Sequence, residues 1–156
     1  IVTIAGWSGS GKTSLIIKLI KALKGRGKRV MTLKNAPEKY YLEPEGKDSV
    51  EFLKAGADTV YLTARNEIMR MESLNTGDSA YEKIKTEFEK YDIVLLEGLI
   101  KEGVPIFEVY KSSKDEGLKI QRDRLTAIIS DQVYPGNIPF FHRDDIDSIL
   151  DFMFSD

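Results

Sequence analysis

Residues 6–13 of this chain are Gly6-Trp7-Ser8-Gly9-Ser10-Gly11-Lys12-Thr13, and they fit the pattern G-x-x-x-x-G-K-[ST] of a phosphate-binding loop. The apolar residues 1–5 before them predict a buried strand. A helix is predicted over residues 11–24, ending at Gly25, because apolar residues recur there at the spacing of one helix face. These are Leu15, Ile16, Leu19, Ile20 and Leu23. Strand, glycine-rich loop and helix are the context that the motif requires, so we predict a phosphate site rather than a glycine-rich turn that binds nothing.

The residue types of this loop explain how a phosphate is held. Glycines adopt backbone conformations that side chains forbid, so successive N–H groups can point inward around a phosphate, and the helix adds its positive end. Lys12 can reach the β- and γ-phosphates and is the catalytic candidate of the loop, while the Thr13 hydroxyl can bind Mg²⁺. The candidate nucleotide-binding residues of this stretch are Gly6, Ser8, Gly9, Ser10, Gly11, Lys12, Thr13 and Ser14.

Composition narrows the class of protein. The chain has 156 residues, the usual size of one domain, so we expect a single nucleotide-binding domain over residues 1–156. The net charge of −2 gives no sign of a nucleic-acid partner. The absence of cysteine excludes disulfides, thiolate zinc sites and cysteine nucleophiles. No apolar run approaches the ~20 residues of a membrane span, and no signal peptide is recognised, so we expect a cytoplasmic protein.

The rest of the chain alternates between strand and helix patterns. Strands are predicted at residues 29–34, 59–62, 67–71, 93–96, 106–110 and 125–130. Helices are predicted at residues 48–55, from residue 79 onward and at residues 144–154, the first two with the spacing of a capping box. Residues 35–47 are polar and proline-containing, which predicts a loop. This alternation predicts an α/β fold, a three-layer P-loop NTPase domain with a mostly parallel (mixed) sheet.

The carboxyl ends of the strands rank the remaining polar residues, because ligands of open α/β sheets collect there. Glu97 closes the most apolar strand and is the candidate second ligand of Mg²⁺, directly or through water, or a group that positions the attacking water. Its alternative is a surface carboxylate at a strand end. Asp92 opens the same strand, so we place it at the opposite edge of the sheet, outside the site.

Three further residues follow predicted strands. Lys34 and Asn35 end the second strand, so they are candidate contacts to phosphate or substrate, although a solvated lysine fits equally well. Asp131 follows a late strand and can accept two hydrogen bonds from a guanine base, or it is a turn residue before Pro135-Gly136. No N-K-x-D guanine signature occurs in the chain. His142 is interpreted as a residue of the turn before the last helix.

Several of these stretches together resemble the molybdopterin-guanine dinucleotide biosynthesis protein B family of GTP-binding P-loop proteins. The matching stretches are residues 6–19 (GWSGSGKTSLIIKL), 46–49 (GKDS), 55–58 (AGAD), 92–98 (DIVLLEG) and 140–152. The phosphate loop is shared by many families, whereas the combination of GKDS, AGAD and the EG strand end is far more distinctive. By residue match, the resemblance assigns Gly9, Gly11, Lys12 and Thr13 to phosphate and Mg²⁺, and Glu97 to the acidic strand end.

The resemblance implies a single α/β domain that dimerises through strands beyond the core sheet. It also implies that the chain binds GTP with Mg²⁺, hydrolyses it slowly and assists the transferase that attaches GMP to molybdopterin. One departure concerns the residues after the second strand. Family members typically show Lys-His and further histidines there, whereas this chain has Lys34-Asn35 followed by APEK.

Two other functions share the same motif. A small-molecule kinase moves the γ-phosphoryl group to a substrate and usually closes an arginine-bearing lid. The arginine-rich segment after Glu97, residues 121–124, is short for such a lid, which favours slow hydrolysis. In a nucleotide-gated interaction module, GTP sets the affinity for a partner and hydrolysis is incidental.

Overall fold

The computed structural model describes residues 1–35, 48–111 and 117–155. Contacts within the chain group it into two compact units, residues 1–35 with 87–156, and residues 36–86. The phosphate loop, Lys34, Glu97 and Asp131 belong to the first unit. The predicted loop at residues 35–47 falls outside the described residues except for Asn35. A single domain over residues 1–156 stays a prediction.

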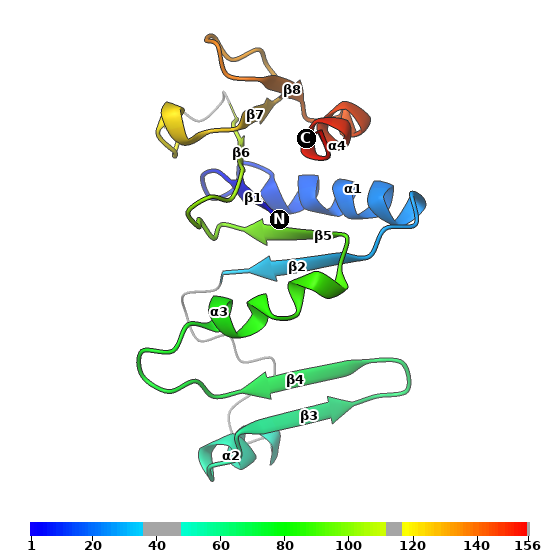
Figure 1. Ribbon diagram of the computed structural model, residues 1–156, viewed down its shortest axis with the longest axis vertical. Helices are drawn as coiled ribbons and strands as arrows, with labels where there is room; N and C mark the ends of the chain where they lie inside the picture. Colours follow the sequence, from blue (N-terminus) through cyan, green and yellow to red (C-terminus); the bar gives the residue numbers. More distant parts are fainter. Residues whose placement is uncertain (36–47, 112–116, 156) are drawn as a thin grey trace. The chain divides into compact units, whose positions relative to one another are not determined.

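The first unit is built on a six-stranded sheet in the order β2-β5-β1-β6-β7-β8 (Figure 1). Every pair of neighbouring strands in this sheet is parallel. The strands are β1 (Val2–Ala5), β2 (Val30–Lys34), β5 (Ile93–Glu97), β6 (Ile106–Val109), β7 (Ala127–Ser130) and β8 (Phe140–His142). The predicted α/β class with a mostly parallel sheet is confirmed.

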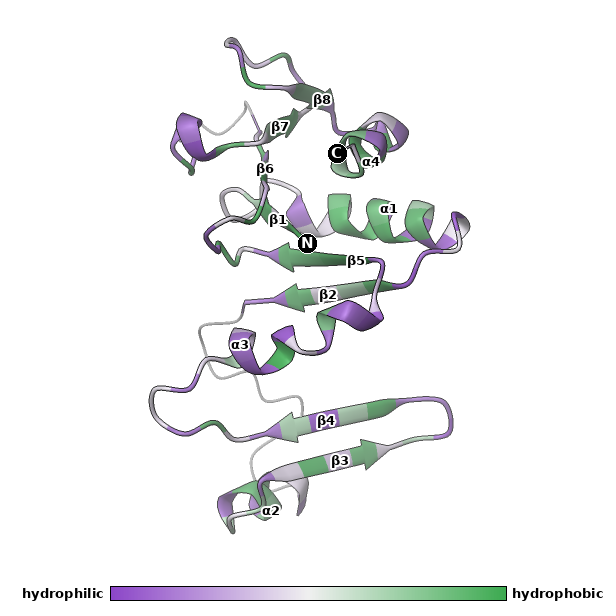
Figure 2. Ribbon diagram, viewed as in Figure 1, coloured by the Kyte–Doolittle hydropathy of each residue, from purple (hydrophilic) through white to green (hydrophobic). Residues whose placement is uncertain are grey.

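One face of this sheet is covered by the helices α1 (Lys12–Gly25) and α4 (Ile146–Met153), which pack against each other. Alternate strand residues such as Ile4, Leu95 and Ile129 form one core with the apolar face of these helices. Ala5, Ile106 and Ile120 form a smaller cluster. Figure 2 shows that the central strands are hydrophobic along their length, as expected for strands buried on both faces.

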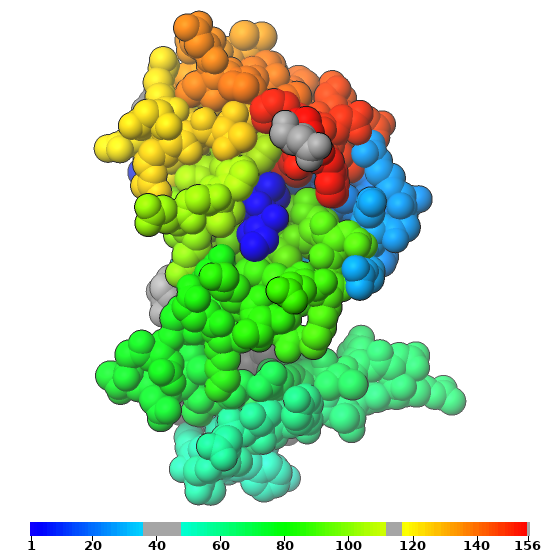
Figure 3. Space-filling model, viewed as in Figure 1, coloured from blue at the N-terminus to red at the C-terminus, as the bar shows by residue number. Residues whose placement is uncertain are grey.

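The central strand β1 is buried along its whole length, whereas Ile1 just before it is exposed. On the face of the molecule drawn in Figure 3, the N-terminal segment is seen as a small dark-blue area near the C-terminal helix in red. The phosphate loop therefore starts from a strand that the core holds in place.

Helix α1 ends at Gly25, where the sequence predicts its end, but its cap involves a different glycine. Gly25 is still helical, and Gly27 takes the left-handed conformation with φ +73°. The N–H of Lys28 donates to the carbonyl of Leu23 (3.0 Å) and the N–H of Gly27 to that of Lys24 (3.0 Å), the two bonds of a Schellman motif. The predicted end of the helix is therefore confirmed, whereas the glycine in the left-handed cap conformation is Gly27 and not Gly25.

The second unit contains α2 (Asp48–Lys54), the antiparallel pair β3 (Thr59–Thr63) and β4 (Ile68–Glu72), and α3 (Ala80–Lys85). Ser79 caps α3 by accepting a hydrogen bond from the N–H of Glu82 (3.4 Å), as the sequence predicts. Glu72 forms ion pairs with Arg70 and Lys83. The antiparallel strands of the described chain thus belong to this unit and form a sheet of their own.

Candidate functional site

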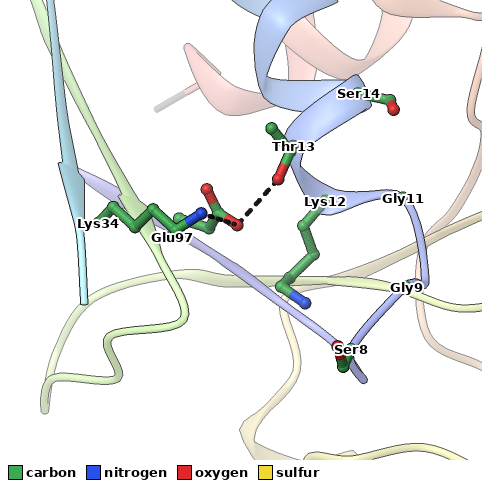
Figure 4. Close-up of a pocket in the computed structure, with 8 residues that line it drawn as sticks. All are labelled: Ser8, Gly9, Gly11, Lys12, Thr13, Ser14, Lys34 and Glu97. Carbon is green, nitrogen blue, oxygen red and sulfur yellow. Dashed lines mark hydrogen bonds and ion pairs between the residues drawn. The ribbon is translucent and has the colours of Figure 1, made fainter. Parts of the chain in front are cut away.

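The candidate site is a cavity of about 410 Å³ at the carboxyl ends of β1, β2 and β5 (Figure 4). Its lining residues come from the phosphate loop, the first turn of α1 and the ends of two neighbouring strands. They are Ser8, Gly9, Gly11, Lys12, Thr13, Ser14, Lys34 and Glu97. The volume lies in the range of small-molecule sites, and the place is the one where parallel sheets bind ligands.

Gly6 and Gly11 give the loop its shape. Gly6 has φ +132°, and a Cβ atom there would lie 2.5 Å from the carbonyl oxygen of Val109, so the loop passes directly against β6. Gly11 is the N-cap of α1 with φ +102°, and no side chain caps the helix. The first turn of α1 also carries no acidic residue. Its N–H groups and positive dipole end therefore face the cavity, where an anion can take the place of a capping side chain.

Lys12 lies across the loop. Its Nζ donates hydrogen bonds to the carbonyl oxygens of Gly6 (3.1 Å) and Trp7 (2.8 Å). In Figure 4 the ammonium group points toward the loop segment that carries Ser8 and Gly9. A positive charge is thus held at the loop that lines the cavity, which suits a ligand with several negative oxygens.

Glu97, Thr13 and Lys34 meet at the other end of the cavity. The Thr13 hydroxyl donates to Oε1 of Glu97 (3.1 Å), and Nζ of Lys34 lies 3.8 Å from the same oxygen. The Glu97 side chain is only 16% exposed, because β5 is a central strand, while that of Lys34 on the sheet edge is 66% exposed. The interpretation of Glu97 as a plain surface carboxylate does not fit this burial.

The donor set of this cluster fits Mg²⁺ bound together with a nucleotide. Mg²⁺ in such sites usually takes one or two protein oxygens and completes its octahedron with phosphate oxygens and water. Thr13 and Glu97 offer a hydroxyl and a carboxylate oxygen 3.1 Å apart. Within the described ranges, no group of three or more acidic or histidine side chains is placed to hold a metal ion by itself.

Four predicted residues do not line the cavity. Gly6 lies against β6 and not at the cavity. Ser10 is buried, and its N–H donates a hydrogen bond to the carbonyl of Trp7 (3.2 Å). Asn35 continues the β2–β5 ladder by donating its N–H to the carbonyl of Glu97 (3.2 Å). Asp131 is exposed after β7 and accepts a hydrogen bond from the Ser130 hydroxyl (3.3 Å). Asp131 is therefore available to a ligand, but it lies outside the phosphate cavity.

Asp92 stands at the opposite edge of the sheet, as predicted. It accepts hydrogen bonds from the backbone N–H of Arg29 (2.6 Å) and from its guanidinium (3.0 Å). These bonds lower the pKa of Asp92 to about 2. Asp92 is thus a structural acid that joins the starts of β2 and β5.

Sequence reasoning missed a group of residues that hold the chain after residue 116 against the phosphate loop. The indole N–H of Trp7 donates to the carbonyl of Gly117 (3.1 Å), and Nζ of Lys119 lies 5.5 Å from the centre of the Trp7 ring. Glu108, fully buried in β6, accepts hydrogen bonds from the N–H groups of Lys119 (2.6 Å) and Ile120 (3.0 Å). Burial raises the pKa of Glu108. A charged residue inside an otherwise apolar strand was the available signal.

Arg143, directly after β8, was missed as well. Its Nη2 donates to the carbonyl of Tyr110 (3.4 Å), and Nη1 lies 3.5 Å from the place where a Cβ of Gly11 would be. A small groove of about 60 Å³ joins these residues and is lined by Gly11, Ser14, Leu15, Lys18, Val109 and Arg143. The half-buried guanidinium therefore reaches the end of the phosphate loop.

A comparison with protein families matches residues 1–131 to the family described as Molybdopterin guanine dinucleotide synthesis protein B. Among curated relatives, the molybdopterin-guanine dinucleotide biosynthesis adapter protein of Escherichia coli is 28% identical over 98% of this chain and 90% of its own length. The adapter protein of the same name from Haemophilus influenzae is 30% identical over 85% of this chain and 74% of its own length.

Solved structures that resemble this chain carry names of the same family as these relatives. A crystal structure of a molybdopterin-guanine biosynthesis protein B is 27% identical, with a TM-score of 0.71 over 97% of this chain and 95% of that one. Bacillus subtilis MobB, 24% identical, shares the fold with a TM-score of 0.72 over 97% of this chain and 96% of that chain. No helix of the described residues has the length and apolarity needed to cross a membrane.

Proposed function

The chain belongs to the Molybdopterin guanine dinucleotide synthesis protein B family, and from this premise we propose that it is a GTP-binding adapter of molybdopterin guanine dinucleotide biosynthesis. In this proposal it binds GTP with Mg²⁺ and hydrolyses it slowly. The observation that carries the proposal is the phosphate loop with Thr13 of its helix bonded to Glu97 of the neighbouring strand.

The polyphosphate part of the ligand is supported by the charge and shape of the cavity. The N–H groups at the start of α1 have no side-chain cap, and the Lys12 ammonium is held at the loop carbonyls of Gly6 and Trp7 in the same cavity. Lys34 brings a second cation to the same cavity. A triphosphate satisfies the N–H groups and neutralises these cations together, which a single carboxylate cannot do.

Hydrolysis needs a group that orients water or holds Mg²⁺ beside the terminal phosphate. Thr13 and Glu97 would hold Mg²⁺, which neutralises charge on the β- and γ-phosphates when bound. Glu97 accepts hydrogen bonds and can hold the attacking water in line with the bond that breaks. Among residues 1–35, 48–111 and 117–155, Glu97 is the one carboxylate that lines the cavity, and we propose slow turnover.

The choice of guanine is the part of the proposal that rests on Asp131. Its carboxylate is exposed at the carboxyl end of β7, on the same edge of the sheet as the phosphate loop. A carboxylate accepts hydrogen bonds from the N1–H and the amine of guanine, a pattern that adenine does not offer. We propose that Asp131 reads the base.

The adapter role comes from the relatives, which are named as adapter proteins of molybdopterin-guanine dinucleotide biosynthesis. We propose that this chain likewise acts with a guanylyltransferase and molybdopterin, as a homodimer. Adding the full chain and GTP to a purified guanylyltransferase is expected to speed the attachment of GMP to molybdopterin. Tighter association in GTP than in GDP without faster attachment would instead indicate a nucleotide-gated module.

The positions of Arg122 and Arg124 favour hydrolysis over the kinase function, which needs arginines in a lid above the cavity. Arg122 is engaged by the loop after β7, where its Nη2 donates to the Tyr134 hydroxyl (3.2 Å) and its guanidinium lies 5.2 Å from the centre of the Tyr134 ring. Neither Arg122 nor Arg124 lines the cavity. A substrate phosphoacceptor therefore has no arginine of this segment above it.

The central experiment is calorimetric titration of the full chain with GTP, ATP and GDP, with and without Mg²⁺. Lys12→Ala is expected to weaken GTP binding by about 1.5–3 kcal/mol, roughly 10- to 150-fold, the range for a hydrogen bond to a charged group. Lys21→Ala, an exposed lysine of the same helix, is the matched control and is expected to bind as the wild type does. Equal affinity of the Lys12 and Lys21 variants would remove the phosphate site.

A further inference from the structure

We propose that Arg143 binds the α-phosphate of the nucleotide, a contact that rests on the proposed function and adds a residue outside the phosphate-loop motif. Arg143 directly follows β8, four strands away from Glu97 in the sheet order. The nucleotide must lie in a direction that leads to Arg143, and Arg143 forms no ion pair with a carboxylate among the described residues.

The sheet order fixes the direction of the nucleotide. Glu97 and Lys34 end β5 and β2, which lie on one side of β1, whereas β6, β7 and β8 lie on the other side. Mg²⁺ and the γ-phosphate belong with Thr13 and Glu97. The α-phosphate and the nucleoside must therefore lead away over Gly11 and Ser14, toward β6, β7 and β8.

Arg143 lies on this path. Its backbone N–H extends the β7–β8 ladder by donating to the carbonyl of Ser130 (3.0 Å), and its side chain turns back toward β6 to reach the carbonyl of Tyr110 (3.4 Å). The phosphate cavity and the groove beside Arg143 share Gly11 and Ser14 among their lining residues. A phosphate chain that leaves the first cavity at Ser14 thus enters the groove that Arg143 lines.

The bonding of Arg143 calls for an anion. Its Nε is buried and has no hydrogen-bond partner among residues 1–35, 48–111 and 117–155. A carboxylate stands close by, but Asp144 pairs with Lys18 through a 2.6 Å hydrogen bond, and this bond lowers the pKa of Asp144. A partly buried guanidinium that bonds only a carbonyl is poorly compensated, and its planar fork matches two oxygens of a phosphate.

The test is calorimetric titration of the full chain with GTP, GDP and inorganic tripolyphosphate in Mg²⁺. Arg143→Gln is expected to weaken all three by about tenfold or more, because each places a phosphate at the same position. Arg143→Lys keeps the charge without the fork and is expected to recover part of the loss. Arg124→Gln, an exposed arginine outside both cavities, is the matched control and is expected to change none of the affinities.

The ligand series separates the possible failures. Weaker GTP binding with unchanged tripolyphosphate binding would assign Arg143 to the nucleoside and overturn the α-phosphate contact. If Arg143→Gln binds all three ligands as tightly as the wild type does, the α-phosphate contact is overturned. GTP binding by the wild type would then still support the proposed function. A wild type that binds none of the three would overturn the proposed function itself. A smaller folded fraction of a variant lowers the number of binding sites that calorimetry reports and leaves the dissociation constants unchanged, so the comparison with the wild type holds for each ligand.

Discussion

Replacing Gly6 with alanine is expected to destabilise the protein more than any other single glycine-to-alanine change in the first unit. Two costs combine at this residue. Its φ of +132° is one that L-residues rarely adopt, and the left-handed region alone costs about 1–2 kcal/mol. The new Cβ would also lie 2.5 Å from the backbone carbonyl oxygen of Val109. Forcing such an overlap in a packed region costs a further ~1–3 kcal/mol. The expected loss is therefore about 2–5 kcal/mol.

Two other glycines provide controls on each part of this reasoning. Gly27 has φ +73° and nothing within 4 Å of its Cβ position, so Gly27→Ala carries the backbone strain without the overlap. Gly25 is helical with open space around it, so Gly25→Ala is expected to stabilise α1 by about 0.5–1 kcal/mol. The free energy of unfolding is measured by urea denaturation followed by circular dichroism. A Gly6 variant as stable as the Gly27 variant would refute the close approach of the loop to β6.

Three further predictions concern charged residues. Glu97→Gln is expected to lower the rate of GTP hydrolysis more than the affinity for GTP, measured by phosphate release and calorimetry; wild-type turnover would exclude its role. Asp131→Asn is expected to reduce the preference for GTP over ATP, and an unaltered ratio of the two affinities would send the base contact elsewhere. The pKa of Asp92 is lowered to about 2 by Arg29, so its ion pair stabilises the fold above the ordinary pKa near 4 and loses this effect as the pH falls toward 2. Asp92→Asn is thus expected to be less stable than the wild type at pH 7 in thermal melts, with the difference shrinking at pH 2.5; a constant difference would contradict the ion pair.

The elements of the parallel sheet near the phosphate loop were predictable because their signal is local. The run at residues 93–96 is apolar throughout, and the structure places β5 at Ile93–Glu97, between β2 and β1. Glu97 follows from the same reasoning, since the carboxyl ends of parallel strands meet at one edge. The acidic residue at each end of this strand, Asp92 and Glu97, could be assigned to opposite edges of the sheet without any coordinates.

The residues that the sequence did not indicate depend on contacts between distant segments. β8 is only three residues long, and it forms a strand because its ladder with β7 pairs Ile128 with Phe140 and Ser130 with His142. Without β8, the sequence makes Arg143 an ordinary residue of the turn before α4. The pairing brings its side chain back to Gly11. Because the sequence did not predict β8, it could not predict the position of the Arg143 side chain either.

In the proposed site, Glu97 is the carboxylate that would bind Mg²⁺. Its Oε1 is shared by the Thr13 hydroxyl at 3.1 Å and the Lys34 ammonium at 3.8 Å. The contact to Lys34 is long and the lysine side chain is mostly exposed, so this ion pair contributes little and is readily displaced. Mg²⁺ binds poorly to one carboxylate alone, whereas phosphate oxygens complete its coordination. We therefore expect Mg²⁺ to bind together with the nucleotide, and Lys34, once displaced from Glu97, would be placed to contact the terminal phosphate at the same end of the cavity.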